Sequence, residues 1–324
     1  LQYFNTHNKQ QEPHPLLPPS LTMFSIVLTL TFISLCFSFA IISASADPDC
    51  THGCRTRPGE TTKKEHRKRF PVTKSDGKMY LVHGQALLHN KKDFTQGLTY
   101  SRSSDRLFQS NGLFHKSSVC HLNATSGETI FCKDMPHNYF AEGIQVYGNR
   151  NGDRPQDEKL IQITWKSKVG FIYNATTLDV IEQFNFDTVR GEGWGICYDK
   201  DRHEFIVSDG SQFLHFWDAD TLEEKRRVAV TRKGLEAARN INELEFVHGK
   251  VLANVWYEDV ILVIDPETGV SESEYNMETL YPQTERKRDR ADVLNGISIS
   301  KDEDTLYITG KMWDRMYLLS LKGF

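Results

Sequence analysis

The chain lacks several features that would assign it quickly to a common class. Lys and Arg number 39 against 43 Asp and Glu, so the net charge of −4 argues against a general nucleic-acid binder. Helical periodicity is nearly absent, and beyond residue 46 there is no long hydrophobic run. Apolar residues nevertheless make up 39% of the 324 positions, which is enough for a sizeable core and excludes wholesale disorder.

The first 46 residues have the composition of a targeting segment. The nearly uncharged run 24–42 follows Met23 and ends in Ala44-Ser45-Ala46, which predicts a cleaved signal peptide. The alternative is a retained membrane anchor, since about 19 apolar residues can span a bilayer. We interpret the polar, Pro-rich residues 1–22 as an upstream leader. The protein is therefore expected in the secretory pathway, either extracellular, vacuolar or in the ER or Golgi lumen.

A polar, basic linker is predicted over residues 47–77. Its run Lys63–Arg69 is interpreted as solvated, with a dibasic processing site as the alternative. Cys50 and Cys54 flank His52, but a zinc site needs four ligands and no second Cys/His pair is near, so a local disulfide is favoured.

A short polar motif, usually with a central Gly, recurs five times from residue 78 onward. The copies begin at residues 96, 142, 192, 242 and 295, so the intervals are 46, 50, 50 and 53. A period of this size indicates a solenoid or a propeller. The copies are Gln96–Leu98, Glu142–Ile144, Glu192–Trp194, Asn242–Leu244 and Asn295–Ile297.

Each repeat contains short runs typical of strands, separated by turn residues. In the fourth copy the predicted strands are Asn242–Val247, Lys250–Trp256, Asp259–Asp265 and Val270–Tyr275. Four strands in about 48 residues correspond to one propeller blade. The fifth copy has three, and Met79–Leu88 is predicted to supply the fourth and close the ring. We therefore expect an all-β, five-bladed propeller over residues 78–324, with four antiparallel strands per blade.

Two further features agree with secretion. Asn123 and Asn174 begin Asn-Ala-Thr glycosylation sequons. Cys120 and Cys132 lie six residues on either side of Ser126, the centre of a predicted hairpin turn, so we expect them to form a disulfide. Cys197 is then expected to remain a free, buried thiol.

Antiparallel pairing brings two sets of residues to one opening of the predicted ring. The innermost strands begin there and the second strands end there, which gathers tryptophans, carboxylates, carboxamides and one Lys. Aromatic walls with a few polar groups are typical of a small-ligand pocket. The alternative is that the tryptophans belong to the core and that Asn295, Glu192 and Asp209 only satisfy polar groups in the channel.

Six segments follow one another in a fixed order: Phe94–Leu98, Phe140–Ile144, Thr164–Lys166, Asn242–Glu245, Ala253–Trp256 and Thr309–Trp313. Together they resemble the plant and bacterial glutaminyl cyclases, five-bladed propellers that convert N-terminal Gln of peptides and proteins to pyroglutamate and release ammonia. The resemblance extends from about Lys78 to Leu321.

The resemblance implies the residues of the site. It places the catalytic carboxylate on Glu142, assisted by Asn242 and Lys311. Two departures are Ala141, where the family pattern has Gly, and the insertion Asn149–Glu158, which lengthens the second repeat. The implied substrate-binding residues are Phe94, Gln96, Phe140, Trp165, Trp194 and Trp256.

The reaction needs a proton carrier and donors for an oxyanion, but it does not need a metal. We therefore expect no cofactor for catalysis, while a structural calcium on the axis is compatible with the fold. The expected partners are peptides with N-terminal Gln, and a monomer is expected, without nucleic acid and with a membrane only if the anchor is retained. The alternatives are a calcium-dependent propeller hydrolase or lactonase, and a peptide- or sugar-binding propeller.

Overall fold

The computed structural model describes residues 72–73, 80–148, 154–233 and 236–322, all of which belong to one compact unit, residues 65–324. The predicted leader, signal segment and Cys50–Cys54 pair lie outside the described residues, as does most of the linker. Within the described ranges, no helix is long and apolar enough to cross a membrane.

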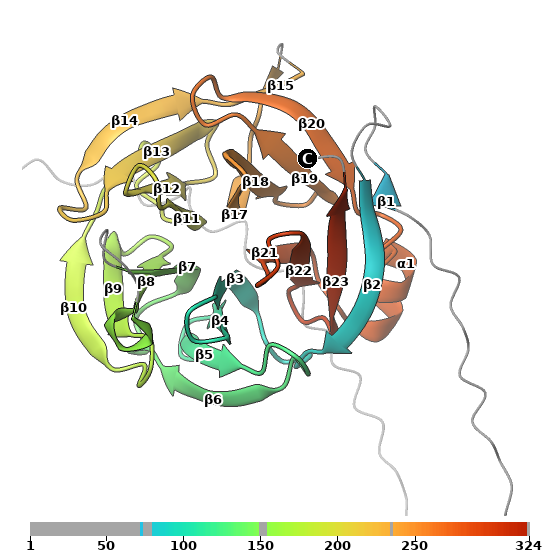
Figure 1. Cartoon of the computed structure of the whole chain (residues 1–324), viewed down its shortest axis with the longest axis horizontal. Helices are drawn as coiled ribbons and strands as arrows, with labels where there is room; N and C mark the ends of the chain where they lie inside the picture. Colours follow the sequence, from blue (N-terminus) through green and yellow to red (C-terminus); the bar gives the residue numbers. More distant parts are fainter. Residues whose placement is uncertain (1–71, 74–79, 149–153, 234–235, 323–324) are drawn as a thin grey trace, which may run out of the picture. The chain divides into compact units, whose positions relative to one another are not determined.

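Five β-sheets are arranged around a common centre, each with one strand innermost and the others following outward (Figure 1). We number these blades one to five in chain order. Blade one contains β3 (Thr95–Ser101), β4 (Arg106–Asn111), β5 (Ser118–Leu122) and β6 (Thr129–Asp134). Blade two contains β7 (Ala141–Tyr147), β8 (Lys159–Thr164), β9 (Val169–Asn174) and β10 (Val180–Asn185).

The other three blades repeat this order, with additions at their outer edges. Blade three contains β11 (Ile196–Asp199), β12 (Glu204–Ser208), β13 (Phe213–Asp218) and β14 (Glu224–Ala229). Blade four contains β17 (Ile241–Val247), β18 (Lys250–Val255), β19 (Val260–Ile264) and β20 (Val270–Asn276), extended by β15 (Thr231–Arg232) and β16 (Glu236–Ala237). Blade five contains β21 (Leu294–Ile299), β22 (Thr305–Gly310), β23 (Arg315–Lys322), β2 (Tyr80–Leu88) and β1 (Val72–Thr73).

The closing strand lies where the repeat count predicts it. β2 pairs antiparallel with β23, from Tyr80 opposite Lys322 to Leu88 opposite Arg315, so the N-terminal part of the propeller completes its last blade. This confirms the predicted all-β propeller and its closure. Because the ends of the ring are joined through a paired strand, blade five offers no unpaired β23 edge to another chain.

Short helical segments were not predicted from the periodicity. Between β20 and β21, the helix α1 (Gln283–Asp289) inserts Arg286, whose Nη2 donates to Asp259 Oδ2 at 2.5 Å. A single 3-10 turn, η1 (Pro155–Asp157), lies within the predicted insertion 149–158. Both segments are too short for an 11- to 18-residue periodicity window, which explains why the sequence pattern does not reveal them.

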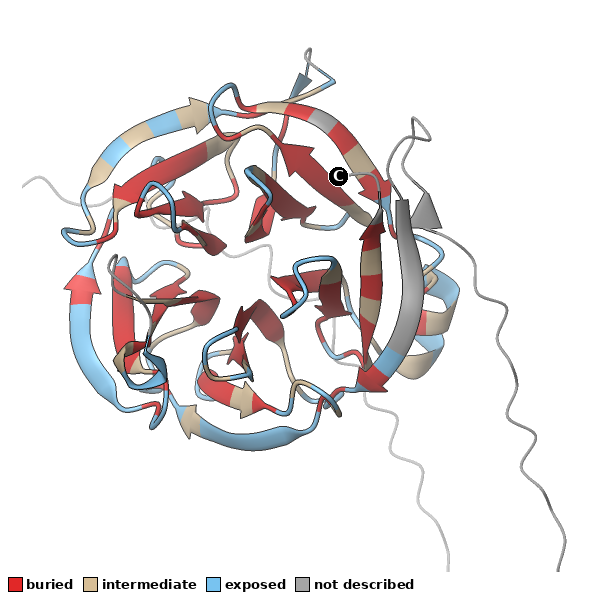
Figure 2. Cartoon of the chain, in the orientation of Figure 1, coloured by how far each residue is buried: buried red, intermediate tan, exposed pale blue. Residues whose placement is uncertain are grey.

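In blades one to three, burial falls from the innermost strand to the outermost one (Figure 2). All seven residues of the innermost strand β3 are buried, whereas five of the six in the outermost strand β6 are exposed. The apolar clusters consist of residues from neighbouring blades, such as Trp217 of blade three packed with Phe184 and Phe186 from blade two. Packing between blades therefore supplies the core.

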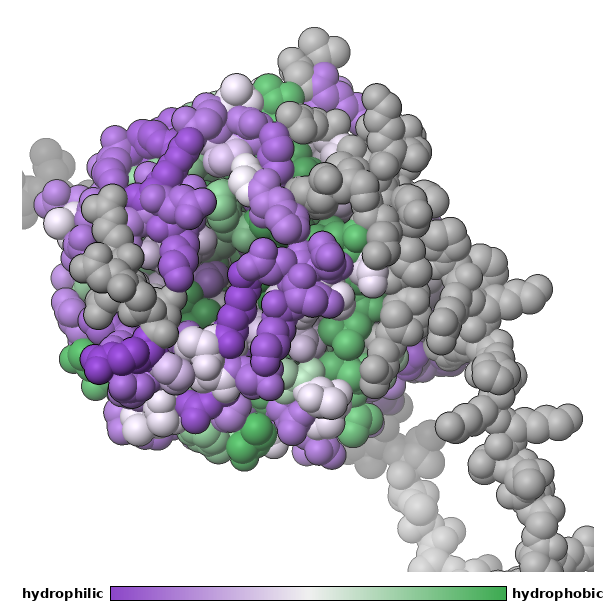
Figure 3. All heavy atoms as spheres, viewed as in Figure 1, coloured by the Kyte–Doolittle hydropathy of each residue, from purple (hydrophilic) through white to green (hydrophobic). Residues whose placement is uncertain are grey.

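The face shown in Figure 3 is mostly hydrophilic, with apolar residues visible between the polar ones.

The innermost strands approach each other backbone to backbone. A Cβ atom on Gly97 would lie 2.7 Å from Ile144 N, and one on Gly195 would lie 2.1 Å from Asn242 O. Glu243 occupies the corresponding position in blade four, and its carboxylate accepts the backbone N–H groups of Leu98 at 3.2 Å and Ile297 at 2.8 Å. This side chain thus joins blade four to blades one and five.

The predicted disulfide is present. Cys120 and Cys132 lie opposite each other on β5 and β6, with their Cα atoms 4.1 Å apart, and they are bonded. Cys197 lies on β11 as a buried free thiol, and burial raises its pKa well above the usual value. Asn123 is exposed and Asn174 half-buried, both at turns between outer strands, so their glycosylation stays a prediction.

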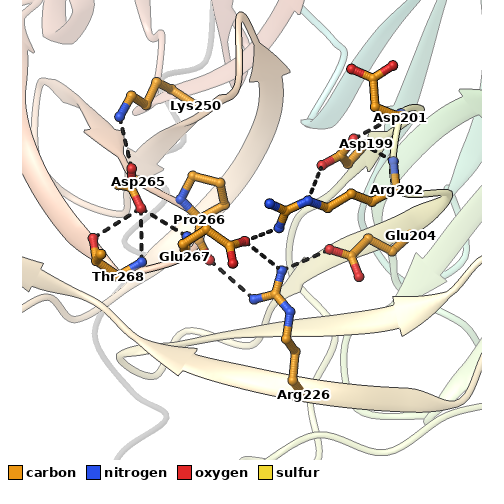
Figure 4. Close-up of polar contacts among 10 residues, drawn as sticks. All are labelled: Asp199, Asp201, Arg202, Glu204, Arg226, Lys250, Asp265, Pro266, Glu267 and Thr268. Carbon is orange, nitrogen blue, oxygen red and sulfur yellow. Dashed lines mark hydrogen bonds and ion pairs between the residues drawn. The ribbon is translucent and has the colours of Figure 1, made fainter.

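An ionic network joins blades three and four (Figure 4). Arg226 on β14 donates through Nη2 to Glu204 at 2.9 Å and to Glu267 at 3.1 Å, and through Nη1 to the carbonyl of Pro266 at 3.2 Å. Its guanidinium lies 3.5 Å from the ring centroid of Phe216, and Arg202 also pairs with Glu267. Arg226 is therefore the one residue of this network that contacts a buried carboxylate, a carbonyl and an aromatic ring.

Arg226→Met is expected to lower the free energy of unfolding by about 2 kcal/mol, because it leaves the buried Glu204 carboxylate without its charged donor. For a domain of this size the melting temperature should fall by roughly 5 °C. The control is Arg227→Met, since Arg227 is about half exposed and pairs with Glu224 on its own strand. Equal melting temperatures for the two variants would contradict this account.

Candidate active site

The residues predicted to share one opening do lie together. In blade one Gly112 N donates to Phe94 O at 2.8 Å, and in blade two Trp165 N donates to Phe140 O at 3.0 Å, so the end of each second strand lies beside the start of the first. The same relation holds for Trp256 in blade four and Lys311 in blade five. Bonds between neighbouring blades, such as Gln96 Nε2 to Glu142 Oε1 at 3.3 Å, join these pairs into one site.

The third blade is aligned differently from its sequence motif. Gly143 N donates to Trp194 O at 2.7 Å, and a Cβ on Gly143 would contact Gly195 and Ile196, so Gly195 corresponds to Gly143. Trp194 is therefore the structural equivalent of Glu142, and the motif-based equivalence of Glu192 with Glu142 is wrong by two residues. Blade three contains two glycines close together, Gly193 and Gly195. The sequence motif includes Gly193, but Gly195 is the glycine that lies against the innermost backbones of blades two and four.

Glu142 carries a buried carboxyl group that accepts a hydrogen bond from Gln96 and interacts electrostatically with Lys311 and Glu192. Its side chain is held by β7 next to Gln96, and the residue is 6% exposed. Burial raises the pKa of Glu142 well above its usual range; the positive charge of Lys311 lowers this pKa, and the negative charge of Glu192 raises it. A carboxyl whose pKa is raised in this way holds a proton more readily than a solvated one, which suits a group that accepts and returns a proton.

Lys311 is the cationic counterpart of Glu142. It follows β22, is 4% exposed, and its Nζ lies 4.7 Å from the ring centroid of Phe94. Burial lowers the pKa of Lys311, while the carboxylates of Glu142 and Asp292 raise it. Its backbone N–H donates to Val293 O at 2.9 Å, which fixes the lysine at the end of its strand.

Aromatic rings form two groups at the site. Phe140 makes edge contacts with Phe94, at 6.3 Å between centroids, and with Trp165, at 5.6 Å. Trp194 and Trp256 meet at 87° with centroids 5.4 Å apart. Such edge-to-face contacts hold large side chains in fixed orientations and leave ring surface for a ligand.

Carboxamides contribute unused hydrogen-bonding capacity. Asn295 Nδ2 donates to Thr95 O at 2.9 Å, and Gln96 connects this asparagine to Glu142. The buried side-chain oxygens of Asn242 and Asn295 have no hydrogen-bond partner among the residues that the structure describes. Buried polar groups are normally satisfied, so unfilled capacity at such a position is consistent with an incoming polar ligand.

Glu192 and Asp209, for which a role as channel groups is the alternative interpretation, have specific contacts. Glu192 Oε2 accepts hydrogen bonds from Trp165 Nε1 at 2.8 Å and Trp194 Nε1 at 2.9 Å. Asp209 accepts the backbone N–H groups of Arg190 and Ser211. Burial raises the pKa of Asp209, but hydrogen bonds from His215, Ser211 and Arg190 outweigh this and lower it to about 2. Among the described residues, no group of three or more His, Cys, Asp or Glu side chains is placed to hold a metal ion.

Fold and site together define a β-propeller with a buried carboxyl, a buried lysine and several aromatic rings at the same end of its innermost strands. A sequence model of the family described as glutamine cyclotransferase matches residues 60–321, and the chain belongs to that family. It is 33% identical over 235 residues to the glutaminyl-peptide cyclotransferase of Arabidopsis thaliana, covering 72% of this chain and 69% of that protein. It is also similar to the crystal structure of Myxococcus xanthus glutaminyl cyclase, with a TM-score of 0.64 and 26% identity over 78% of this chain and 99% of that one.

Proposed function

We propose that the protein cyclises the N-terminal Gln of peptides and proteins to pyroglutamate with release of ammonia. The observation that carries the proposal is Glu142, a buried carboxyl whose pKa is raised by burial and which interacts electrostatically with Lys311, itself 4.7 Å from the Phe94 ring centroid. A free α-amine has a pKa near 8, so a raised carboxyl pKa narrows the gap across which the proton must move.

The reaction balances with one carboxylate. The neutral α-amine attacks the side-chain carbonyl carbon of the substrate Gln, which forms the ring C–N bond and a tetrahedral oxyanion. Glu142 takes the proton from the attacking nitrogen and returns it to the side-chain nitrogen, and the bond from carbon to that nitrogen then breaks to release ammonia. Glu142 ends the cycle in its starting state.

The other residues bind the substrate and stabilise the intermediate. Lys311 and the Asn242 carboxamide are assigned as donors to the oxyanion. Phe94, Phe140 and the three site tryptophans would bend the substrate side chain toward its own amine, and Gln96 would orient Glu142. These roles are proposed from the location of the residues at the opening.

The direct test is to incubate the purified full chain with a Gln-initiated dipeptide. We expect stoichiometric ammonia and a product that no longer reacts with amine reagents, and Glu142→Gln should release neither. A peptide- or sugar-binding propeller would instead retain the ligand without ammonia release. That result, from a folded protein, would refute the proposal.

Activity is expected to survive strong chelators, because each step uses a carboxylate, an ammonium and carboxamides of this chain. Initial rates should be measured after dialysis against EDTA, with the melting temperature as a control for a structural ion such as calcium. Loss of turnover with an unchanged melting temperature, restored by calcium or zinc, would favour the calcium-dependent hydrolase or another metal-dependent mechanism.

We further propose that the protein acts in the secretory pathway as a monomer. The Cys120–Cys132 disulfide supports an oxidising compartment, where such bonds persist. The same proposal includes glycosylation of the two sequons, a signal peptide or anchor within residues 1–46, and a linker over residues 47–77. Peptide mapping of protein from secretory cells would test the cleavage at Ala46 and the glycans at Asn123 and Asn174.

A further inference from the structure

We propose that Glu192 is a positioning residue that fixes the indoles of Trp165 and Trp194 and thereby sets the shape of the substrate pocket. This inference deepens the proposed function and rests on it for its kinetic part. In this role Glu192 is more than a polar group of the channel: it determines how the side chain of the substrate Gln is held.

The geometry is that of one acceptor shared by two donors. Glu192 Oε2 receives Trp165 Nε1 at 2.8 Å and Trp194 Nε1 at 2.9 Å, and the Glu192 side chain is 13% exposed. Trp165 follows β8 of blade two and Trp194 precedes β11 of blade three. A single carboxylate oxygen therefore determines the relative orientation of two indoles from neighbouring blades.

The position of Glu192 is itself determined by its loop. Thr188 Oγ1 accepts the backbone N–H of Glu192 at 3.0 Å and donates to its carbonyl at 2.8 Å. Asp209 accepts Arg190 N at 2.8 Å, and the Arg190 guanidinium lies 5.7 Å from the Trp194 ring centroid. Lys166 Nζ lies 3.7 Å from Glu192 Oε1 and 4.0 Å above Trp165. Thr188 thus fixes the backbone of Glu192, and Lys166 lies close to its carboxylate.

The contacts have two physical consequences. Both indole N–H groups are used by Glu192, so the tryptophans present their ring surfaces to a ligand. Removing the acceptor leaves two poorly solvated donors unsatisfied, and the rings must turn to find other partners. The carboxylate also faces Glu142 together with Lys311, so its charge opposes ionisation of the catalytic acid.

The test compares Glu192→Leu, which removes the acceptor, with Glu192→Gln, which keeps an acceptor oxygen and removes the charge. We expect Glu192→Leu to raise KM for a Gln-dipeptide by about 10-fold. Glu192→Gln should change KM little but move the acid limb of kcat/KM to lower pH, because the pKa of Glu142 falls when the neighbouring negative charge is removed. The matched control is Glu182→Leu, on the exposed strand β10 of blade two.

A second measurement does not depend on activity. The chain contains five Trp, so selective ¹⁵N labelling should give five indole N–H resonances, assigned with Trp→Phe variants. Glu192→Leu should shift the Trp165 and Trp194 resonances, while Trp217 and Trp313 remain in place as references. This readout applies to the folded full chain even if the wild type released no ammonia.

The outcomes separate the two proposals. Unshifted Trp165 and Trp194 resonances would overturn the positioning role whatever the activity. Shifted resonances with unchanged KM and an unchanged pH profile would also overturn it, because the contact would then be only structural. A folded wild type without ammonia release, but with shifted resonances, would refute the cyclase proposal and retain the indole contact. If Glu192→Leu fails to fold, the indole resonances of Glu192→Gln decide: replacing the carboxylate by a neutral acceptor should still shift the Trp165 and Trp194 signals, and unshifted signals would overturn the positioning role.

Discussion

Glu142→Gln is expected to lower kcat on a Gln-dipeptide by about 100- to 10,000-fold, the range typical of losing an acid–base group. Gln is close to Glu in shape and keeps a partner for Gln96, so folding and substrate binding should be nearly unchanged. It cannot accept the proton of the attacking amine or return one to the leaving ammonia. The measurement is kcat together with the melting temperature.

The control for this variant is Glu245→Gln. Glu245 is also buried, and burial raises its pKa to about 8 despite a hydrogen bond from Ile299 N–H, but it lies on β17 beyond Leu244, outside the set of site residues. Its replacement should leave kcat unchanged. The assignment of Glu142 is wrong if Glu142→Gln keeps more than about a tenth of the rate, or if Glu245→Gln alone is inactive and folded.

Lys311→Met should lower kcat by about 100-fold, as expected when a donor to a developing oxyanion is lost. It should also move the acid limb of the pH–rate profile to higher pH. The charge of Lys311 lowers the pKa of Glu142, so its removal lets that pKa rise, and a higher pH is then needed to ionise the general base. Lys311→Arg retains the charge and should leave the acid limb near its original position.

The direction in which the acid limb of the pH–rate profile moves provides the most direct test of the role of Glu142. Lys311→Met and Glu192→Gln remove opposite charges that face the same carboxyl, so their acid limbs should move in opposite directions. Limbs that move in the same direction, or that do not move, would show that Glu142 is not the group that titrates in the profile. Melting temperatures measured across the same pH range would separate unfolding from titration.

Local pairing could be predicted from the sequence because it is encoded within one repeat. The strands of blade four, the closing strand Tyr80–Leu88 and the paired cysteines of the hairpin around Ser126 all lie where their spacing predicts them. Antiparallel neighbours joined by short turns leave little choice of register. The antiparallel pairing of the first two strands of each blade likewise predicts that Glu142, Trp165, Trp256 and Lys311 lie at one opening.

The tertiary structure decided whatever depends on contacts between blades. The sequence motif identified Gly193 as the third-blade glycine, and only the close approach of the innermost backbones shows that Gly195 occupies this position and that Trp194 is level with Glu142. Likewise, no spacing rule shows that Glu192 accepts two indole N–H groups, because the donors come from blades two and three and meet only when those blades pack. The sequence by itself thus determined the blades and which side chains lie where their first two strands meet, because that pairing is local, whereas the packing of one blade on the next determined how those side chains are oriented.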